Sequence, residues 1–433
     1  MPRSSSKPLT FIDAFAGCGG LSLGLMQAGW TGRFAVERDK FAFATLKANL
    51  LAKNSPHKYV WPRWLPKEPI GIVELISQYR EKLEAFAGTV DVLVGGPPCQ
   101  GFSSAGRRQH DDPRNQLFTS YLNLVDIIKP KAVLIENVRG FTLDFSADEE
   151  IKNFSQTLKA QLSGAYTVHE QLLDLSIFGV PQARTRYFVL AFRSELNVPD
   201  PFAHLQSSLP SFLRSLRLSV PVSSSAAISD LEVSRSGTQP SSESKGFEET
   251  RYAGPLTRYQ KLMNSGCKVP ADLRLARHSV NITDRFKQII ELSHAEGRLN
   301  TSIGTEMRAR FGLKKMALRV LDPDRPSPTI TSMPDDLLHY SEPRTLTVRE
   351  NARLQTFPDW YSFQGKYTTG GHLRKQEVPR FTQVANAVPP LVARAIGETL
   401  TDLLRNKPTT AGASDRKVCS LLHGVQQGAE VRA

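Results

Sequence analysis

The cysteine with the most distinctive setting in the chain follows two prolines. Cys99 stands in the segment Gly96-Pro97-Pro98-Cys99-Gln100, just after the apolar run Val90–Val94. A short, β-branched run closed by glycines is typical of a buried parallel strand. Prolines fix φ, so the loop that leaves this strand is stiff and can hold a thiolate at a defined distance from a ligand. We therefore interpret Cys99 as a nucleophile rather than as a structural residue.

A glycine-rich turn and an acidic residue after the next strand indicate a nucleoside cofactor. Residues 13–22 read DAFAGCGGLS, which is typical of a strand end, a tight turn and a helix start. Glycines let the backbone approach a ligand closely, and a helix N-terminus favours negative charge. Glu37 ends the next predicted strand, where a carboxylate can accept hydrogen bonds from both ribose hydroxyls. Ser22 stands where a dinucleotide fingerprint has its third glycine, so a nicotinamide cofactor fits poorly.

Two further groups become meaningful beside a nucleophilic cysteine. Glu136 ends the predicted strand 132–136, on the same sheet edge as Cys99, where a carboxyl can deliver a proton to a ring nitrogen. Arg184 and Arg186 have strand spacing and would share one face, and guanidinium groups suit phosphates and carbonyl oxygens. Each has an ordinary alternative: a solvated or capping carboxylate, and a surface salt-bridge face.

The elements that would position these groups alternate between strands and helices. Strand-like segments at 9–15, 34–36, 90–94 and 132–136 are separated by helical patterns, which predicts a doubly wound α/β fold with a mostly parallel sheet. Residues 166–175 and 186–192 would finish this sheet as a hairpin. Serine- and proline-rich residues 194–250 read as loops or mobile linkers, and 251–343 are basic and poorly periodic. We expect a disordered N-terminus (1–8), a catalytic domain (9–193), an inserted recognition domain (194–343), a return to the catalytic domain (344–406) and a disordered tail (407–433).

Bulk composition limits the choice of partners and compartment. The 433 residues carry a net charge of +13, which favours a polyanion such as nucleic acid. The four cysteines are scattered without metal-ligand spacing, so we expect neither a zinc site nor a disulfide framework. No apolar run is long enough to cross a bilayer, and no signal peptide is recognisable, which indicates a cytoplasmic protein.

Read in order, these segments resemble the cytosine-5 DNA methyltransferase family. The resemblance covers nearly the whole chain outside residues 194–320, and its strength lies in the order of the motifs. The matching segments are DAFAGCGG at 13–20, Glu37, PPCQ at 97–100, DPRNQLF at 112–118, ENV at 136–138, QARTR at 182–186, LTVRE at 346–350, RLQTFP at 353–358 and QVANAVPP at 383–390.

The resemblance implies roles for individual residues. The Cys99 thiolate would add to C6 of a flipped-out cytosine, Glu136 would hold or protonate N3, and Arg186, or else Arg184, would steady the ring carbonyl. The residues implied for S-adenosylmethionine are Phe15, Gly17, Gly19, Gly20, Leu21, Glu37, Pro97, Leu117, Asn386 and Ala387. Those implied for duplex DNA, in and after a mobile catalytic loop, are Gln100, Ser103, Arg107, Arg108 and Arg114.

The chain departs from the family pattern at three places. Gly71 precedes Ile72 where the family has an aspartate near the adenine amino group, so that contact is in doubt. Ala385 replaces a glycine of the late motif, and Cys18 replaces a larger apolar residue. No departure removes a catalytic group.

Two other functions remain open at this stage. An RNA cytosine-5 methyltransferase on the same scaffold would be expected to have a smaller recognition region. A non-catalytic DNA-binding regulator would have no need of Cys99, Glu136 and Arg186. For the leading interpretation we expect a monomer that methylates duplex DNA, either alone or beside a separate restriction endonuclease.

Overall fold

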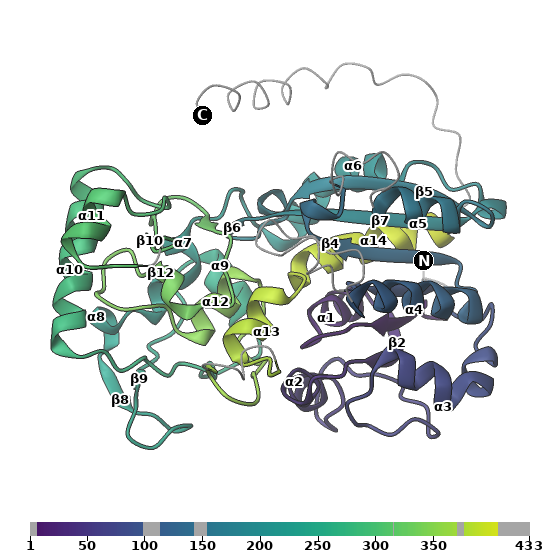
Figure 1. The fold of residues 1–433 in the computed structure, drawn as a ribbon, viewed down its shortest axis with the longest axis horizontal. Coiled ribbons are helices and arrows are strands. Elements are labelled where there is room, and N and C mark those ends of the chain that lie inside the picture. Colours follow the sequence, from purple (N-terminus) through teal and green to yellow (C-terminus); the bar gives the residue numbers. More distant parts are fainter. Residues whose placement is uncertain (1–6, 98–112, 143–153, 315, 370–375, 406–433) are drawn as a thin grey trace, which may run out of the picture.

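A six-stranded mixed sheet forms the centre of the larger of two lobes (Figure 1). The computed structural model describes residues 7–97, 113–142, 154–314, 316–369 and 376–405. In spatial order the strands of the sheet are β2 (Thr31–Val36), β1 (Thr10–Ala14), β3 (Val92–Gly95), β4 (Ala132–Asn137), β7 (Thr185–Arg193) and β5 (Tyr166–Asp174). Strands β1 to β4 are parallel, and β7 is antiparallel to both of its neighbours. The predicted doubly wound α/β fold is confirmed.

Alternate side chains of these strands enter two separate cores. Val92 and Val94 pack in one hydrophobic cluster, whereas Leu93 of the same strand packs in the other, as the two-residue period of a strand requires. Both faces are therefore buried, which explains the continuous apolar runs in the sequence. The helices over the first face are α1 (Gly20–Gln27), α2 (Lys40–Leu50), α6 (Pro201–Leu216) and α14 (Pro390–Arg405). Those over the second face are α3 (Ile72–Glu84), α4 (Pro113–Ile128) and α5 (Phe154–Leu162).

Helices α1 and α14 approach so closely that only a glycine fits between them. A Cβ at Gly24 would lie 2.3 Å from the carbonyl oxygen of Pro390 and 2.4 Å from the Cβ of Ala393. The last helix of the described residues thus packs directly on the first one. This contact returns the chain at α14 to the lobe in which it began, and the predicted return from residue 344 stays a prediction.

The smaller lobe is made mostly of short elements. Its helices are α7 (Ser224–Ile228), α8 (Val233–Ser236), α9 (Arg258–Met263), α10 (Val280–Ala295), α11 (Thr305–Arg310) and α12 (Val348–Leu354), and α13 (Arg380–Asn386) lies between the lobes. Its short strands are β8 (Thr238–Pro240), β9 (Glu248–Thr250), β10 (Arg319–Val320), β11 (Ser327–Pro328) and β12 (Leu337–Leu338). A separate apolar cluster that includes Phe286, Ile289 and Val320 forms the core of its outer part.

The prediction of loops over residues 194–250 is wrong in part. Helix α6 begins after Asp200, whose carboxylate accepts a hydrogen bond of 2.9 Å from the backbone N–H of Phe202. Its apolar face packs on α14 of the sheet lobe. Pro201 stands in the first turn, where it is tolerated, so the proline content did not exclude a helix. The predicted domain boundary between 193 and 194 stays a prediction.

Residues 251–343 also contain more regular structure than their composition indicated. Helix α10 is a 16-residue helix whose buried residues lie on one side. Within the described residues no helix has the length and apolar character needed to span a membrane.

Candidate active site

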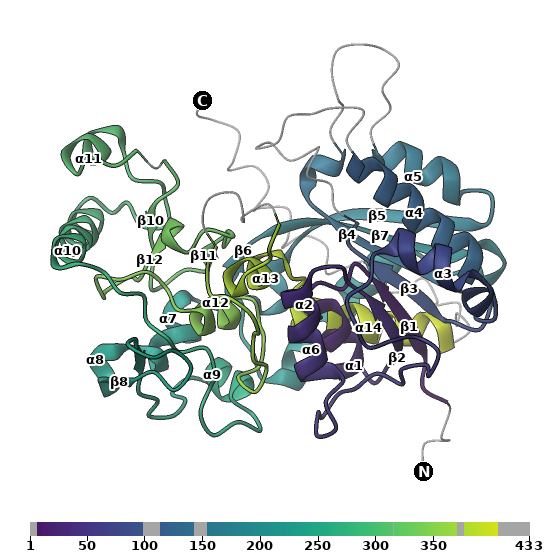
Figure 2. The ribbon, with the colours of Figure 1, turned by 60° about the horizontal axis from the view of Figure 1, so that its bottom comes forward.

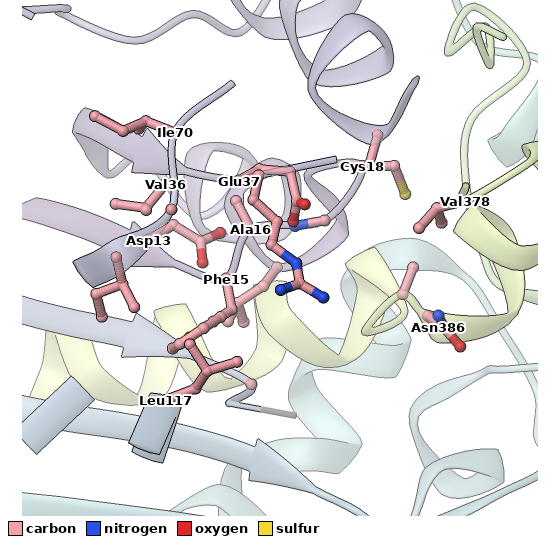
Figure 3. Close-up of a pocket in the computed structure, with 18 of the residues that line it drawn as sticks. Asp13, Phe15, Ala16, Cys18, Val36, Glu37, Ile70, Leu117, Val378 and Asn386 are labelled. Carbon is pink, nitrogen blue, oxygen red and sulfur yellow. The ribbon is translucent and has the colours of Figure 1, made fainter. Parts of the chain in front are cut away.

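A pocket of about 590 Å³ opens at the carboxyl ends of the parallel strands. This is the edge at which open α/β sheets bind ligands. Figure 3 shows Asp13, Phe15, Val36 and Glu37 approaching the pocket from the ends of β1 and β2, with Asn386 on the opposite side. Of the sequence-predicted cofactor residues, the structure places these in its lining: Phe15, Gly17, Gly20, Leu21, Glu37, Leu117, Asn386 and Ala387.

The turn between β1 and α1 has an unusual backbone. Phe15, Gly17 and Gly19 all have positive φ, at 68°, 55° and 92°. Positive φ is costly for a bulky residue such as Phe15 and is often found at functional sites. The turn is fixed by a hydrogen bond of 2.9 Å from the Ala16 backbone N–H to the Val36 carbonyl oxygen. The backbone is thereby held at the floor of the pocket.

The Glu37 carboxylate is positioned by two backbone donors. Its Oε2 accepts from the Gly17 N–H at 2.9 Å, and its Oε1 accepts from the Asp39 N–H at 2.7 Å. Burial raises the pKa of Glu37, and these two hydrogen bonds oppose the rise. Each oxygen keeps a further lone pair for a hydroxyl donor. This geometry suits the two hydroxyls of a ribose.

Asp13 is a buried carboxyl that the sequence analysis did not assign to the site. One oxygen accepts from the Ser22 hydroxyl, while Oδ1 has no hydrogen-bond partner and the residue lines the pocket. Burial raises the pKa of Asp13 to about 7, and the charge of Glu37 adds to the rise. The signal that could have found it is its position in the glycine-turn motif, at the carboxyl end of the first strand.

One wall of the pocket contains Gly71, which stands where the family pattern has an aspartate. Gly71, Ile72, Glu74 and Ser77, at the start of α3, line it. The Ile70 backbone N–H donates to the Glu37 carbonyl oxygen at 2.8 Å, which keeps this wall beside the ribose position. Gly71 has no side chain to offer, so the polar side chains available here are those of Glu74 and Ser77.

Glu136 also lines this pocket, and the two predicted arginines lie near its carboxylate. The Arg186 Nε lies 3.2 Å from Glu136 Oε1. Arg184 is 2% exposed, and its Nε and Nη1 have no hydrogen-bond partner. Burial raises the pKa of Glu136, against the lowering effect of Arg186 and Arg184. Burial and the charge of Arg186 lower the pKa of Arg184 to about 9, so it remains cationic at neutral pH.

The loop that leads to Cys99 starts beside Glu136. A Cβ on Gly96 would lie 3.4 Å from Glu136 Oε2. The Asn137 amide donates to the Pro97 carbonyl oxygen at 3.0 Å, which ties the loop to the end of β4. Cys99 follows Pro97 by two residues and lies outside the described residues. The chain therefore enters the predicted nucleophile segment next to the predicted acid.

Several predicted residues lie elsewhere. Gly19 and Pro97 are buried but do not line the pocket; a Cβ on Gly19 would meet the Tyr361 hydroxyl at 2.8 Å. The predicted residues that lie outside the described residues, or whose side chains do, are Gln100, Ser103, Arg107, Arg108 and Arg114, and the predicted tail 407–433. Across the described ranges, no group of three or more His, Cys, Asp or Glu side chains could hold a metal ion.

Comparisons with known proteins identify the family of the chain. The model of the C-5 cytosine-specific DNA methylase family matches residues 9–402. The Type II methyltransferase M.DdeI of Desulfomicrobium norvegicum is 30% identical over 414 residues, which cover 92% of this chain and 90% of the relative. The Type II methyltransferase M.AgeI of Thalassovita gelatinovora is 30% identical over 454 residues, which cover 90% of this chain and 98% of the relative.

A solved structure gives independent support for the fold. It is a prophage-encoded protein of E. coli described as a DNA modification methyltransferase, with a TM-score of 0.62 and 24% identity. The match covers 92% of this chain and 100% of that one. Taken with the family match, these findings show that the chain belongs to the family of C-5 cytosine-specific DNA methylases and is a DNA cytosine-5 methyltransferase.

Proposed function

We propose that the protein transfers a methyl group from S-adenosylmethionine to C5 of a flipped-out cytosine in duplex DNA, through a covalent bond between Cys99 and C6. The observation that carries this proposal is that Glu37 and Glu136 line the same pocket. A methyl donor and its acceptor base must meet within one such site.

The residues of the pocket fit S-adenosylmethionine. Its volume of about 590 Å³ is in the range of small-molecule sites. Glu37 would accept from the ribose hydroxyls, Phe15 and Leu117 would contact apolar parts of the cofactor, and Asn386 would close the opposite side. Glu74 or Ser77 would take the adenine amino group in place of the absent aspartate. When bound, the cofactor supplies an electrophilic methyl group.

The residues around Glu136 would prepare the cytosine. Addition of the Cys99 thiolate forms a C6–S bond and moves negative charge into the ring toward N3 and the carbonyl oxygen. Burial raises the pKa of Glu136, which makes its carboxyl easier to protonate; it would deliver a proton to N3, and Arg186 would hold the ring carbonyl. C5 then becomes nucleophilic. After the methyl group has been transferred, the C5 proton is lost to solvent, the C6–S bond breaks, and N3 returns its proton to Glu136, which restores the thiolate and the acid.

The base must leave the duplex for this chemistry, at a cost of about a few kcal/mol. We propose that Gln100, Ser103, Arg107, Arg108 and Arg114 contact the DNA near the vacated position. Residues 194–343 would select the sequence. We expect one active site per monomer and action in the cytoplasm, with a cognate restriction endonuclease, where there is one, acting separately on the same sites.

Sequencing of 5-methylcytosine tests the proposal. The wild-type chain is expressed in a host that lacks cytosine methylation, and the genome is mapped for the modified base. One enriched motif is expected. Soluble protein that leaves the genome unmodified but methylates tRNA would favour the RNA enzyme, and binding without any methylation would favour a regulator.

Covalent trapping tests the nucleophile. Duplex DNA with 5-fluorocytosine in the motif should form a stable complex with the wild-type protein and none with Cys99→Ser, because fluorine cannot leave C5 as a proton does. Cys267→Ser is the matched control, since Cys267 is a free cysteine that is not among the residues lining the active-site pocket. Trapping by the Cys99→Ser variant would exclude Cys99 as the nucleophile.

A further inference from the structure

A second, shallow concavity lies next to the strand that leads into the active-site arginines. It has a volume of about 460 Å³ and is lined on one side by Ala183. Ala183 ends the short strand β6 (Gln182–Ala183), which pairs with β11 between the lobes (Figure 2). The Thr329 hydroxyl donates to the Ala183 carbonyl oxygen at 2.8 Å. Because Arg184 is the next residue, this concavity is adjacent to the position proposed for the target base.

Arg319 is the charged residue of this concavity, and its guanidinium group is free. No hydrogen bond, ion pair or aromatic contact involves this group anywhere in the described part of the chain. Its backbone is fixed on both sides, because Arg319 pairs with Leu337 of β12 and forms a bridge with Ser302. A free cation on a fixed backbone is pre-organised for an anionic ligand.

The remaining polar groups suit a phosphate. Ser302 contributes a hydroxyl donor, whereas the hydroxyls of Thr301 and Thr329 already donate to the carbonyl oxygens of Arg298 and Ala183. No carboxylate stands among the described residues that line the concavity. Arginine and hydroxyl side chains are common ligands of DNA phosphates. A phosphate projects outward from the duplex and fits a hollow, whereas base edges are read by side chains that project into a groove.

We propose that this concavity binds a backbone phosphate of the DNA beside the target cytosine, with Arg319 as its charged ligand. The proposal rests on the proposed function and adds a specific contact to it. A contact of this kind fixes the register of the duplex over the pocket without reading sequence. It therefore predicts an effect on affinity and on salt dependence, but none on the methylated motif.

The test measures DNA binding as a function of salt. Full-length wild-type and Arg319→Ala proteins are titrated with a short duplex carrying the motif found by genome sequencing, at about 50 to 200 mM salt. Each phosphate contact contributes about 0.9 to the slope of log K against log salt concentration. Arg319→Ala should lower the magnitude of this slope by about one and weaken binding about 3- to 10-fold.

Three further variants test whether Arg319 binds a phosphate or has only a structural role. Arg319→Lys keeps the charge and should retain the slope. Ser302→Ala should weaken binding slightly without changing the slope, because it removes no charge. Arg80→Ala is the control for lost charge: Arg80 is an exposed residue of α3 that pairs with Glu84 at 3.0 Å, and its removal should leave the slope unchanged.

Two results would overturn the proposal while leaving the proposed function intact. One is an unchanged slope in a folded Arg319→Ala protein. The other is a methylated motif that becomes degenerate at one position, which would make Arg319 a reader of bases. If the wild-type protein itself neither binds nor methylates DNA, both the proposed function and this inference fail.

Discussion

The two lobes bury charged side chains in opposite ways. In the smaller lobe the buried arginines of α12 are matched with carboxylates: Arg353 pairs with Asp230 at 3.1 Å and with Asp359 at 2.5 Å, and Arg349 pairs with Asp272 at 3.4 Å. In the sheet lobe Asp13 and Arg184 are equally buried but keep polar atoms without partners. Unpaired buried charge is costly. The comparison indicates that the paired arginines of α12 join distant segments, whereas Asp13 and Arg184 keep polar atoms available for a ligand.

The scaffold role is clearest at Arg353. It joins α12 to Asp230, which is 123 residues earlier in the chain, and also donates to the Ala227 carbonyl oxygen at 3.0 Å. The carboxylates of Asp359 and Asp230 raise the pKa of Arg353, so its guanidinium group stays charged. The irregular segments of the smaller lobe are thereby fixed to a helix that follows them in sequence.

The largest expected effect comes from the acid of the site. Glu136→Gln should lower kcat by about 10²- to 10⁴-fold, because a neutral amide cannot transfer a proton to N3. Affinity for S-adenosylhomocysteine, measured by calorimetry, should stay within about 3-fold, since Glu37 is unchanged. The single-turnover methylation rate provides the measurement.

Glu170→Gln is the matched control for this variant. Glu170 lies on β5 of the same sheet. Its carboxylate accepts a hydrogen bond from the Ser155 hydroxyl at 2.7 Å, and Glu170 is not among the residues that line the active-site pocket. Its replacement should leave the methylation rate unchanged. A Glu136→Gln rate within a factor of ten of wild type would remove the proton-transfer role.

A slightly smaller effect, on stability, is expected in the other lobe. Arg353→Met should lower the free energy of unfolding by about 3–5 kcal/mol, because two buried carboxylates lose their partner. Urea unfolding measures the change. The exposed pair of Arg80 with Glu84 is the comparison, and Arg80→Ala should cost at most about 1 kcal/mol. Equal stability of the Arg353→Met and wild-type proteins would show that these ion pairs do not hold the lobe together.

The difference between the sheet lobe and the smaller lobe also explains which residues could be predicted from the sequence. Strand ends are marked by short apolar runs, so Glu37 and Glu136 could be assigned to one sheet edge before the structure was known. Asp230, one of the partners of Arg353, lies 123 residues before it in the sequence, and no periodic pattern connects the two residues. Asp13 was missed for another reason: its role depends on an empty partner position that only packing reveals. Helix α6 was missed because serine and proline content outweighed its apolar face.

Asp13 offers the most direct test of unpaired burial. Its pKa of about 7, against an ordinary value of 3.8, means that the folded protein keeps a proton that the unfolded chain releases between these two values. Stability should therefore fall as pH rises through this range and level off above pH 7. Asp13→Asn removes the titrating group, so its stability relative to wild type should increase by about 2–3 kcal/mol between about pH 5 and pH 8.

Asp91→Asn is the control that separates the effect of a buried carboxyl without a partner from the effect of burial itself. Asp91 is also buried in the sheet lobe, but its carboxylate pairs with Lys131 at 2.7 Å and accepts from the Thr10 backbone N–H at 2.7 Å. Removing its charge breaks these contacts, so Asp91→Asn should be less stable than wild type at pH 8. Urea unfolding of both variants across the pH range gives the comparison. If the stability of Asp13→Asn relative to wild type does not rise between about pH 5 and pH 8, the Asp13 carboxyl is satisfied in solution and is not left unpaired for a ligand in the pocket.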